Sequence, residues 1–195
     1  MHNATFFLIL ESWILHDAMD DYTLITECVK GSSKAQKALF DKFAPKMLAI
    51  CKRYMKSQYE AEDVLQDGFV KVFGKISEFK MDGSLEGWVM RIMVNTALDA
   101  IRKNKKFQNS IDVDDVQHKV SFENFQFEEM DLEYLQKLIH DMPEGYRVVF
   151  NMFAIEGFSH KEIADTLGVS ESTSKSQYLR ARAFLRTQLE LLKSD

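Results

Sequence analysis

The chain has 195 residues, with eight Gly, two Pro and two Cys, and a formal net charge of −5 from 25 Lys and Arg against 30 Asp and Glu. So few glycines and prolines, between long segments with apolar residues three or four apart, predict an all-α fold of one or two domains. Two cysteines are too few for a disulfide framework or a four-cysteine zinc site. We therefore expect reduced thiols, no metal, and a cytoplasmic protein.

The first eighteen residues contain the apolar runs FFLIL and WIL. They lack the positive start of a signal peptide and the roughly 20 apolar residues of a membrane span, so no membrane insertion is expected. We favour the hypothesis that the natural start is Met19 and that residues 1–18 are an extension from a mis-called start. The alternative is a short amphipathic helix that packs on the protein or on a partner.

Residues 19–106 predict a compact helical domain with a charge of +4, from sixteen Lys and Arg against twelve Asp and Glu. Apolar spacing and helix-starting residues define its elements. Helices are expected at residues 23–29, 35–43, 45–56, 60–76 and 85–102.

The segment AEDVLQDGFVKVF, residues 61–73, divides into two faces. Asp63, Gln66 and Asp67 fall on the polar face at spacings of three and four. Paired carboxylates are used in acid–base catalysis and in metal sites, but no His accompanies this pair. A solvated surface is the simplest interpretation, and a face that docks on another protein is the best functional alternative. The opposite, apolar face is formed by Leu65, Phe69, Val72 and Ile76.

The helix expected at 85–102 combines aromatic and basic residues. Trp88 and Ile92 can face a core, with Ala100 or Ile101. Basic residues beside aromatic ones suit single-stranded nucleic acid, because charges hold the backbone and aromatic rings accommodate unstacked bases. A basic helix end that complements the helix dipole is the alternative. The residues of interest are Phe79 before the helix and, along it, Arg91, Asn95, Arg102, Lys103, Lys105 and Lys106.

Residues 107–130 hold one base against six acids and are weakly periodic, which predicts an acidic linker. Residues 131–195 predict a second helical domain. Within it, Ser159 and Glu162 form a capping box, Gly168 ends the short helix, and Ser170 begins the next. This pattern is typical of a helix-turn-helix that lays its second helix in the DNA major groove, and an ordinary helical hairpin is the alternative.

The second helix of this motif has a predicted inner and outer face. The inner face is formed by Ser174, Tyr178, Ala181, Leu185 and Leu189, of which all but Ser174 suit a core. The outer residues are Lys175, Ser176, Leu179, Arg180 and Arg182.

The order of these segments resembles the sigma-70 family of bacterial initiation factors, in its small two-domain extracytoplasmic-function (ECF) group. The resemblance spans about residues 22–192. It is carried by AEDVLQDGFVKVF, by FKMDGSLEGWVMRIMVNTALDAIRK and by MPEGYRVVFNMFAIEGFSHKEIADTLGVSESTSKSQYLRAR. The segment SKSQ, residues 174–177, resembles the sequence of the subgroup that is common in Bacteroidetes.

The resemblance implies a monomer that binds core RNA polymerase and promoter DNA, with an anti-sigma factor as regulator and with no cofactor or catalysis of its own. Asp63, Gln66 and Asp67 would dock on the clamp helices of the largest subunit, and the second domain on the flap of the second subunit. The acidic linker would thread through the polymerase interior. For the −10 element, Phe79, the loop 80–85, Trp88 and Asn95 would hold a flipped base, and Arg91, Arg102 and Lys103 the adjacent phosphates. For the −35 element, Lys175, Ser176, Leu179 and Arg180 would face the major groove, with Ser172, Thr173 and Arg182 on the backbone.

The sequence also departs from the family pattern. Ser172, Thr173 and Ser174 stand where much of the family has Gly-Thr-Val, and Gln177 stands where an Arg is frequent. Gln177 is therefore expected to read adenine or to contact a phosphate. The alternative function is a stand-alone helix-turn-helix regulator, which should dimerise and bind a palindrome without polymerase. A third and least favoured hypothesis is a helical enzyme that uses Asp63 and Asp67.

Overall fold

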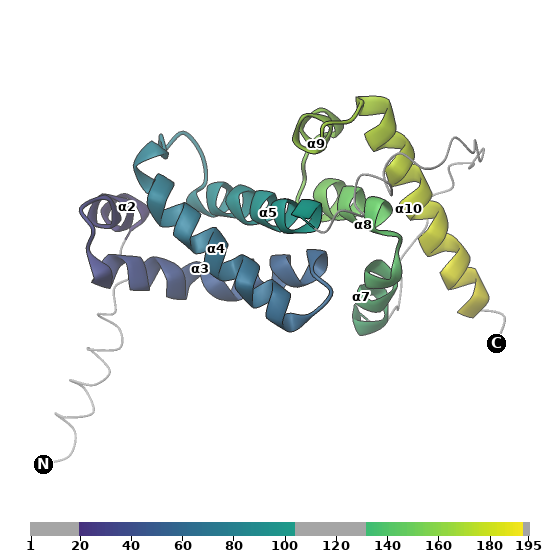
Figure 1. Ribbon diagram of the computed structural model, residues 1–195, viewed down its shortest axis with the longest axis horizontal. Coiled ribbons are helices and arrows are strands. Elements are labelled where there is room, and N and C mark those ends of the chain that lie inside the picture. The colour runs from purple at the N-terminus through teal and green to yellow at the C-terminus, as the bar shows by residue number, and fades with distance from the viewer. Residues whose placement is uncertain (1–19, 104–131, 193–195) are drawn as a thin grey trace, which may run out of the picture.

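The computed structural model describes residues 20–103 and 132–192, and every regular element in these ranges is helical (Figure 1), which confirms the all-α prediction. None of these helices is long and apolar enough to cross a membrane. The predictions for residues 1–18 and for the acidic linker lie outside the described residues. The N-terminal domain contains α2 (Asp21–Val29), α3 (Ser33–Tyr54), α4 (Gln58–Lys75), a 3-10 turn (Ile76–Glu78) and α5 (Leu85–Lys103). The C-terminal domain contains α7 (Leu132–Asp141), α8 (Glu144–Phe150), a π-helical turn (Asn151–Ile155), α9 (His160–Leu167) and α10 (Glu171–Leu192).

The prediction of two helices separated near Pro45 is wrong, because α3 runs through this residue without a break. Proline removes one backbone hydrogen bond and crowds the carbonyl four residues earlier, at a cost of about 3 kcal/mol. Each fully buried large apolar side chain returns about 1.5–3 kcal/mol. One continuous buried stripe on both sides of the proline therefore outweighs the local penalty. Its members are Leu39, Phe43, Met47 and Ile50.

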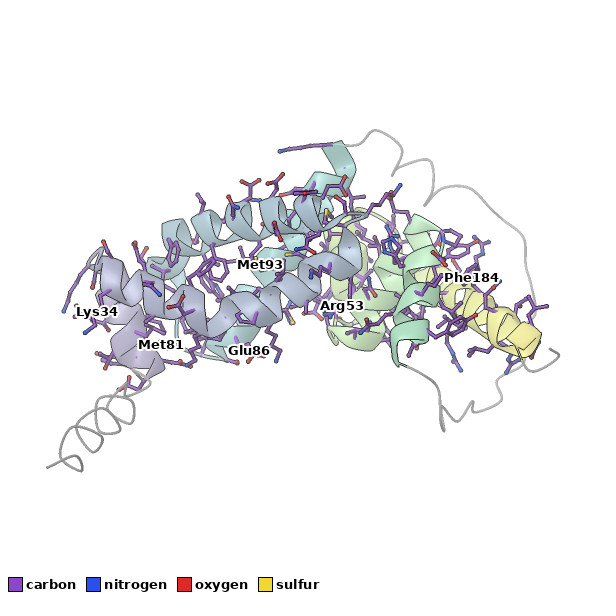
Figure 2. The ribbon with its side chains drawn as sticks, turned by 90° about the horizontal axis from the view of Figure 1, so that it is seen from below. Lys34, Arg53, Met81, Glu86, Met93 and Phe184 are labelled. Carbon is purple, nitrogen blue, oxygen red and sulfur yellow. The ribbon has the colours of Figure 1, made fainter. Side chains whose placement is uncertain are left out.

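The core of the N-terminal domain lies where α3, α4 and α5 pack together, and Figure 2 shows Met93 of α5 among these helices. The predicted apolar face of α4 is confirmed, since its residues are at most 7% exposed. Gly68 allows α4 to approach α5 closely: a Cβ atom at this position would lie 2.2 Å from the sulfur of the fully buried Met93.

Two glycines of the same helix give a matched test of this packing. Gly68→Ala is expected to destabilise the protein, because displacing Met93 costs about 1–3 kcal/mol and exceeds the gain in helix propensity of at most about 1 kcal/mol. Gly74→Ala meets no atom within 4 Å and should stabilise by about 0.4–1 kcal/mol. Urea denaturation checks both signs. Equal shifts for the two variants would contradict the close approach.

The C-terminal domain packs in two directions. Its outer part forms a small separate core between α7 and α10, from Leu138, Ile139, Met142, Ala181, Leu185 and Leu189. Its inner part, α8 to α9, instead joins the core of the N-terminal domain through Val148, Val149, Met152, Phe158 and Ile163. Figure 1 accordingly shows α9 and α8 beside the end of α5. The two domains therefore touch through buried apolar residues.

Candidate nucleic-acid interface

The polar face of α4 is exposed as predicted. Asp63, Gln66 and Asp67 all reach solvent on the side of the helix away from the core. Two large apolar side chains share this side, with Tyr59 81% and Val70 72% exposed. In the described parts of the chain, no group of three or more His, Cys, Asp or Glu side chains is arranged to hold a metal ion. Acidic and apolar groups therefore lie together on one exposed helix face.

The predicted aromatic residues before and within α5 come together. The ring centroids of Phe79 and Trp88 lie 5.4 Å apart at an interplanar angle of 49°, and both rings are partly buried. The exposed loop between them includes Met81, which has a φ of 57°. Asn95 is exposed two helical turns beyond Trp88, about 10 Å along the same face. An aromatic pair, an exposed loop and an amide therefore share one surface.

The two predicted phosphate-binding arginines of α5 are in contact with the C-terminal domain. Arg91 donates to Oε1 of Glu162 at 2.8 Å, and its guanidinium lies 4.9 Å from the centre of the Phe158 ring. Arg102 donates to the carbonyl oxygen of Thr166 near the end of α9. Lys103 is exposed. Sequence patterns do not predict these contacts, because the partners of the two arginines lie 71 and 64 residues away.

The helix-turn-helix is built as its local sequence predicts. Ser159 and Glu162 form the capping box at the start of α9, with Oε2 of Glu162 accepting from the Ser159 backbone at 2.8 Å. Hydrogen bonds from Ser159, and then the Arg91 contact, lower the pKa of Glu162 to about 2. Gly168 ends α9 with a φ of 72°. Ser170 then accepts from the backbone nitrogen of Thr173 at 3.0 Å, in the first turn of α10.

The outer face of α10 presents the predicted DNA-contacting residues at different depths. Ser172 and Lys175 are exposed, and Lys175 pairs with Glu171 at 2.7 Å. The hydroxyls of Ser172 and Thr173 lie 2.7 and 2.8 Å from that of Ser170. Amide groups and hydroxyls at a helix start suit phosphate contacts. Half-buried residues on or beside this face are Thr173, Ser176, Leu179, Arg180 and Arg182.

The expectation that Gln177 contacts DNA is wrong. Gln177 is 1% exposed, because its position three residues after Ser174 places it on the inner face of α10. Ser174 is fully buried, and its Oγ lies 2.9 Å from Nδ1 of His160. The His160 ring stacks on Phe153 at 4.1 Å and 10°. The Ser that replaces the family's Val is therefore explained: it pairs with a histidine of the preceding helix.

A second link joins the two domains through a buried carboxylate. Glu156 has a side chain only 1% exposed, and its Oε1 accepts from Nε and Nη2 of Arg53 at 3.1 and 2.8 Å. Its Oε2 accepts from the hydroxyl of Tyr54 at 3.1 Å. Asn151 donates to the Arg53 carbonyl at 3.1 Å. Figure 2 shows Arg53 at the junction between α3 and the C-terminal helices. Burial raises the pKa of Glu156.

Comparison with known families identifies both halves of the chain. The model for sigma-70 region 2 matches residues 39–107, and the model for sigma-70 region 4 matches residues 132–185. The chain belongs to the sigma-70 family. Curated relatives of this sigma factor include the ECF RNA polymerase sigma-E factor of Escherichia coli K12, which is 25% identical over 189 residues that cover 91% of this chain and 98% of that protein. The Haemophilus influenzae sigma-E factor is 24% identical over 187 residues, 90% and 98% of the two chains.

Solved structures agree with this placement. The sigma factor RpoE of Bartonella quintana, in complex with the anti-sigma factor NepR, is 28% identical with a TM-score of 0.53, covering 82% of this chain and 97% of that one. CnrH in complex with the cytosolic domain of CnrY shares the fold at 22% identity and a TM-score of 0.53, covering 90% and 99%. The protein is thus an ECF sigma factor, an RNA polymerase-binding factor for transcription initiation.

Proposed function

We propose that this sigma factor directs core RNA polymerase to promoters with −35 and −10 elements and starts melting at the −10 element. One observation carries this proposal: a single chain contains two different surfaces suited to DNA. The first is a helix-turn-helix whose recognition helix has an exposed outer face, and the second is an aromatic pair beside an exposed asparagine. The first suits duplex DNA, and the second suits an unstacked base.

Polymerase docking is assigned to α4. Asp63, Gln66 and Asp67 are exposed with Tyr59 and Val70 beside them, so the face offers charge, amide and apolar contacts together. Its partner in this proposal is the clamp-helix coiled coil of the largest polymerase subunit, and the C-terminal domain meets the flap of the second subunit. A polar, solvent-accessible rim around an apolar contact is the usual arrangement of a protein interface.

DNA contacts are divided between α5 and α10. Phe79, Trp88 and Asn95 hold a flipped −10 base of the non-template strand, and Arg91, Arg102 and Lys103 hold the neighbouring phosphates. On α10, the exposed and half-buried residues of the outer face read the −35 element. Leu179, half-buried away from the inner face, can touch a thymine methyl. The −35 set is Ser172, Thr173, Lys175, Ser176, Leu179, Arg180 and Arg182.

The proposal extends to organisation and control. The N-terminal domain comprises residues 19–106, the linker 107–130 and the C-terminal domain 131–195. The protein acts as a cytoplasmic monomer, needs no cofactor and leaves catalysis to the polymerase. The Bartonella quintana relative is bound to an anti-sigma factor, and we infer an anti-sigma factor as the regulator here too. The chain is assigned to the Bacteroidetes-like subgroup on its SKSQ segment.

Run-off transcription separates this function from its alternative. The protein is mixed with core polymerase and a promoter library, and specific transcripts are sequenced. Transcripts that share a −35 and a −10 element support the proposal. A stand-alone regulator would instead dimerise and bind a palindrome tightly without polymerase, and that result, with no polymerase binding, would overturn it.

Two alanine variants should fail at different steps. Arg180→Ala should weaken closed-complex binding by about 1–3 kcal/mol if Arg180 contacts a base. Asn95→Ala should bind the closed complex normally and melt it poorly, because the flipped base loses its polar partner. Gel mobility at low temperature and permanganate reactivity of unpaired thymines measure the two steps. Arg186→Ala is the control, because Arg186 is a basic residue of α10 outside the predicted −35 set, and this variant should complete both steps normally. Normal melting by Asn95→Ala would refute the pocket.

A further inference from the structure

One acidic residue stands among the residues assigned to the −10 element. Between Arg91 and Lys106 the sequence holds five bases and a single acid, Asp99. Asp99 lies four residues after Asn95 and three before Arg102, so these three side chains share one side of α5. A carboxylate on a surface that binds DNA repels the phosphates of the strand. Its presence on this side of α5 therefore needs a structural explanation.

Asp99 holds two cations that come from two helices, since α4 packs against α5 (Figure 1). Its Oδ2 accepts from Nζ of Lys71 on α4 at 3.1 Å, and its Oδ1 accepts from Nη1 of Arg102 at 3.1 Å. The other terminal nitrogen of Arg102 donates to a separate oxygen, the carbonyl of Thr166. Asp99 therefore fixes one nitrogen of the guanidinium and leaves the second to another oxygen acceptor. The side chains of Lys71 and Arg102 are 42% and 39% exposed, so both cations also reach solvent.

We propose that Asp99 is a positioning residue of the −10 surface: it holds Lys71 and Arg102 side by side, and Lys71 is a further residue that binds a phosphate of the melted non-template strand. The inference rests on the proposed function, because only a strand bound along α5 brings phosphates to this pair. It adds a DNA contact from α4, a helix otherwise assigned to polymerase docking alone.

Cations that are already ordered bind a single strand better for a physical reason. Lys and Arg side chains are long, and each loses rotamer freedom when it binds a phosphate. A carboxylate that holds both of them removes part of that cost before the strand arrives. Asp99 also repels phosphate, but this repulsion acts between exposed groups and is screened by salt. We therefore expect the gain from positioning to exceed the loss from repulsion.

Asp99→Asn separates the two effects, because they predict opposite signs. Charge alone predicts tighter binding when an acid is removed from a surface that faces DNA. Positioning predicts binding that is weaker by about threefold to tenfold, since two long side chains lose their partner. The measurement is fluorescence anisotropy of the holoenzyme, formed from this sigma factor and core polymerase. Its probe is a labelled single-stranded non-template oligonucleotide that carries the −10 element identified by run-off transcription. Asp99→Glu keeps the carboxylate and should bind nearly as tightly as the parent.

Lys71→Gln tests the new phosphate contact. It should weaken binding of the same oligonucleotide and reduce the slope of log affinity against log salt by about 0.7, the share of one phosphate on a single strand. Lys37→Gln is the matched control, because Lys37 pairs with Asp41 on α3, outside the assigned −10 surface, and its slope should equal the parent's. Polymerase affinity and thermal unfolding, measured separately, should match the parent in both variants, since exposed ion pairs add little stability. An unchanged slope in Lys71→Gln would overturn the phosphate contact.

A background that lacks both cations isolates the role of Asp99. In the double variant Lys71→Gln with Arg102→Gln, Asp99 has neither cation to hold, so adding Asp99→Asn should no longer weaken binding and should strengthen it slightly by charge. An equal loss in this background and in the parent would overturn the positioning role. Unchanged or tighter binding by Asp99→Asn alone would also overturn it and leave the proposed function standing. A parent holoenzyme that does not prefer the −10 oligonucleotide over a scrambled one would refute the proposed function and this inference with it.

Discussion

Reversing both charges of the α4 face, with Asp63→Lys and Asp67→Lys in one variant, is expected to weaken binding to core polymerase by at least about a hundredfold. A docking face that pairs these carboxylates with basic groups would place like charges together in the variant, at a cost of several kcal/mol. The free protein should be nearly unaffected, because both side chains are exposed and surface substitutions usually stay within about 0.5 kcal/mol. Fluorescence anisotropy with labelled sigma factor measures the affinity.

The matched control carries the same change in net charge elsewhere on the N-terminal domain. Glu27→Lys with Asp41→Lys reverses two exposed carboxylates on α2 and α3. The affinity of this control for polymerase should stay within about threefold of the parent's, because the change in overall charge has only a small effect on the association rate. If the two double variants weaken binding equally, general electrostatics explains the loss and α4 is not the docking face. Thermal unfolding of both variants excludes a folding defect.

The parts of the structure that were predictable from sequence are those set by local rules. Ser159 and Glu162 cap α9 because a hydroxyl and a carboxylate three residues apart satisfy the first free amide groups. Gly168 ends the helix because it alone adopts a positive φ without strain. The apolar periodicity of α4 and α10 likewise fixed which side faces a core. Each rule spans at most one or two helical turns.

The errors came from interactions that local rules do not contain. Pro45 breaks a helix by propensity, but burial on both sides of it held α3 together. Gln177 was expected to contact DNA because it stands where an Arg is frequent in the family, whereas its position in the helix turns it inward. The interdomain contacts were missed entirely, because Arg53 and Glu156 are 103 residues apart and no local pattern links two positions so far apart in the sequence.

The pairing of Ser174 with His160 predicts the second large effect. Ser174→Val introduces the residue common in the family and removes the partner of the His160 ring nitrogen. A partly buried polar group left without its partner costs about 1–3 kcal/mol, so this apparently conservative change should destabilise the helix-turn-helix. Urea denaturation, and binding to a −35 duplex, should both show the loss.

The double variant His160→Phe with Ser174→Val should recover most of that stability, because replacing both partners by apolar groups is nearly neutral and Phe can keep the stack on Phe153. A positive coupling energy between the two sites would show direct interaction. If Ser174→Val alone is as stable as the parent, the hydrogen bond contributes nothing and the substitution of Val by Ser has no structural cause.

The pH dependence provides an independent test of the same pair. Burial, and then the nearby Lys175, lower the pKa of His160 below its usual 6.5, with Glu171 opposing. As the pH falls below 6.5, the unfolded chain takes up a proton that the folded chain does not, so the stability of the parent should fall until the lowered pKa is passed. The double variant lacks this group and should lose less stability between pH 7.5 and pH 5.5. Equal losses in the parent and the double variant would show that the ring stacked on Phe153 is not held neutral by the fold.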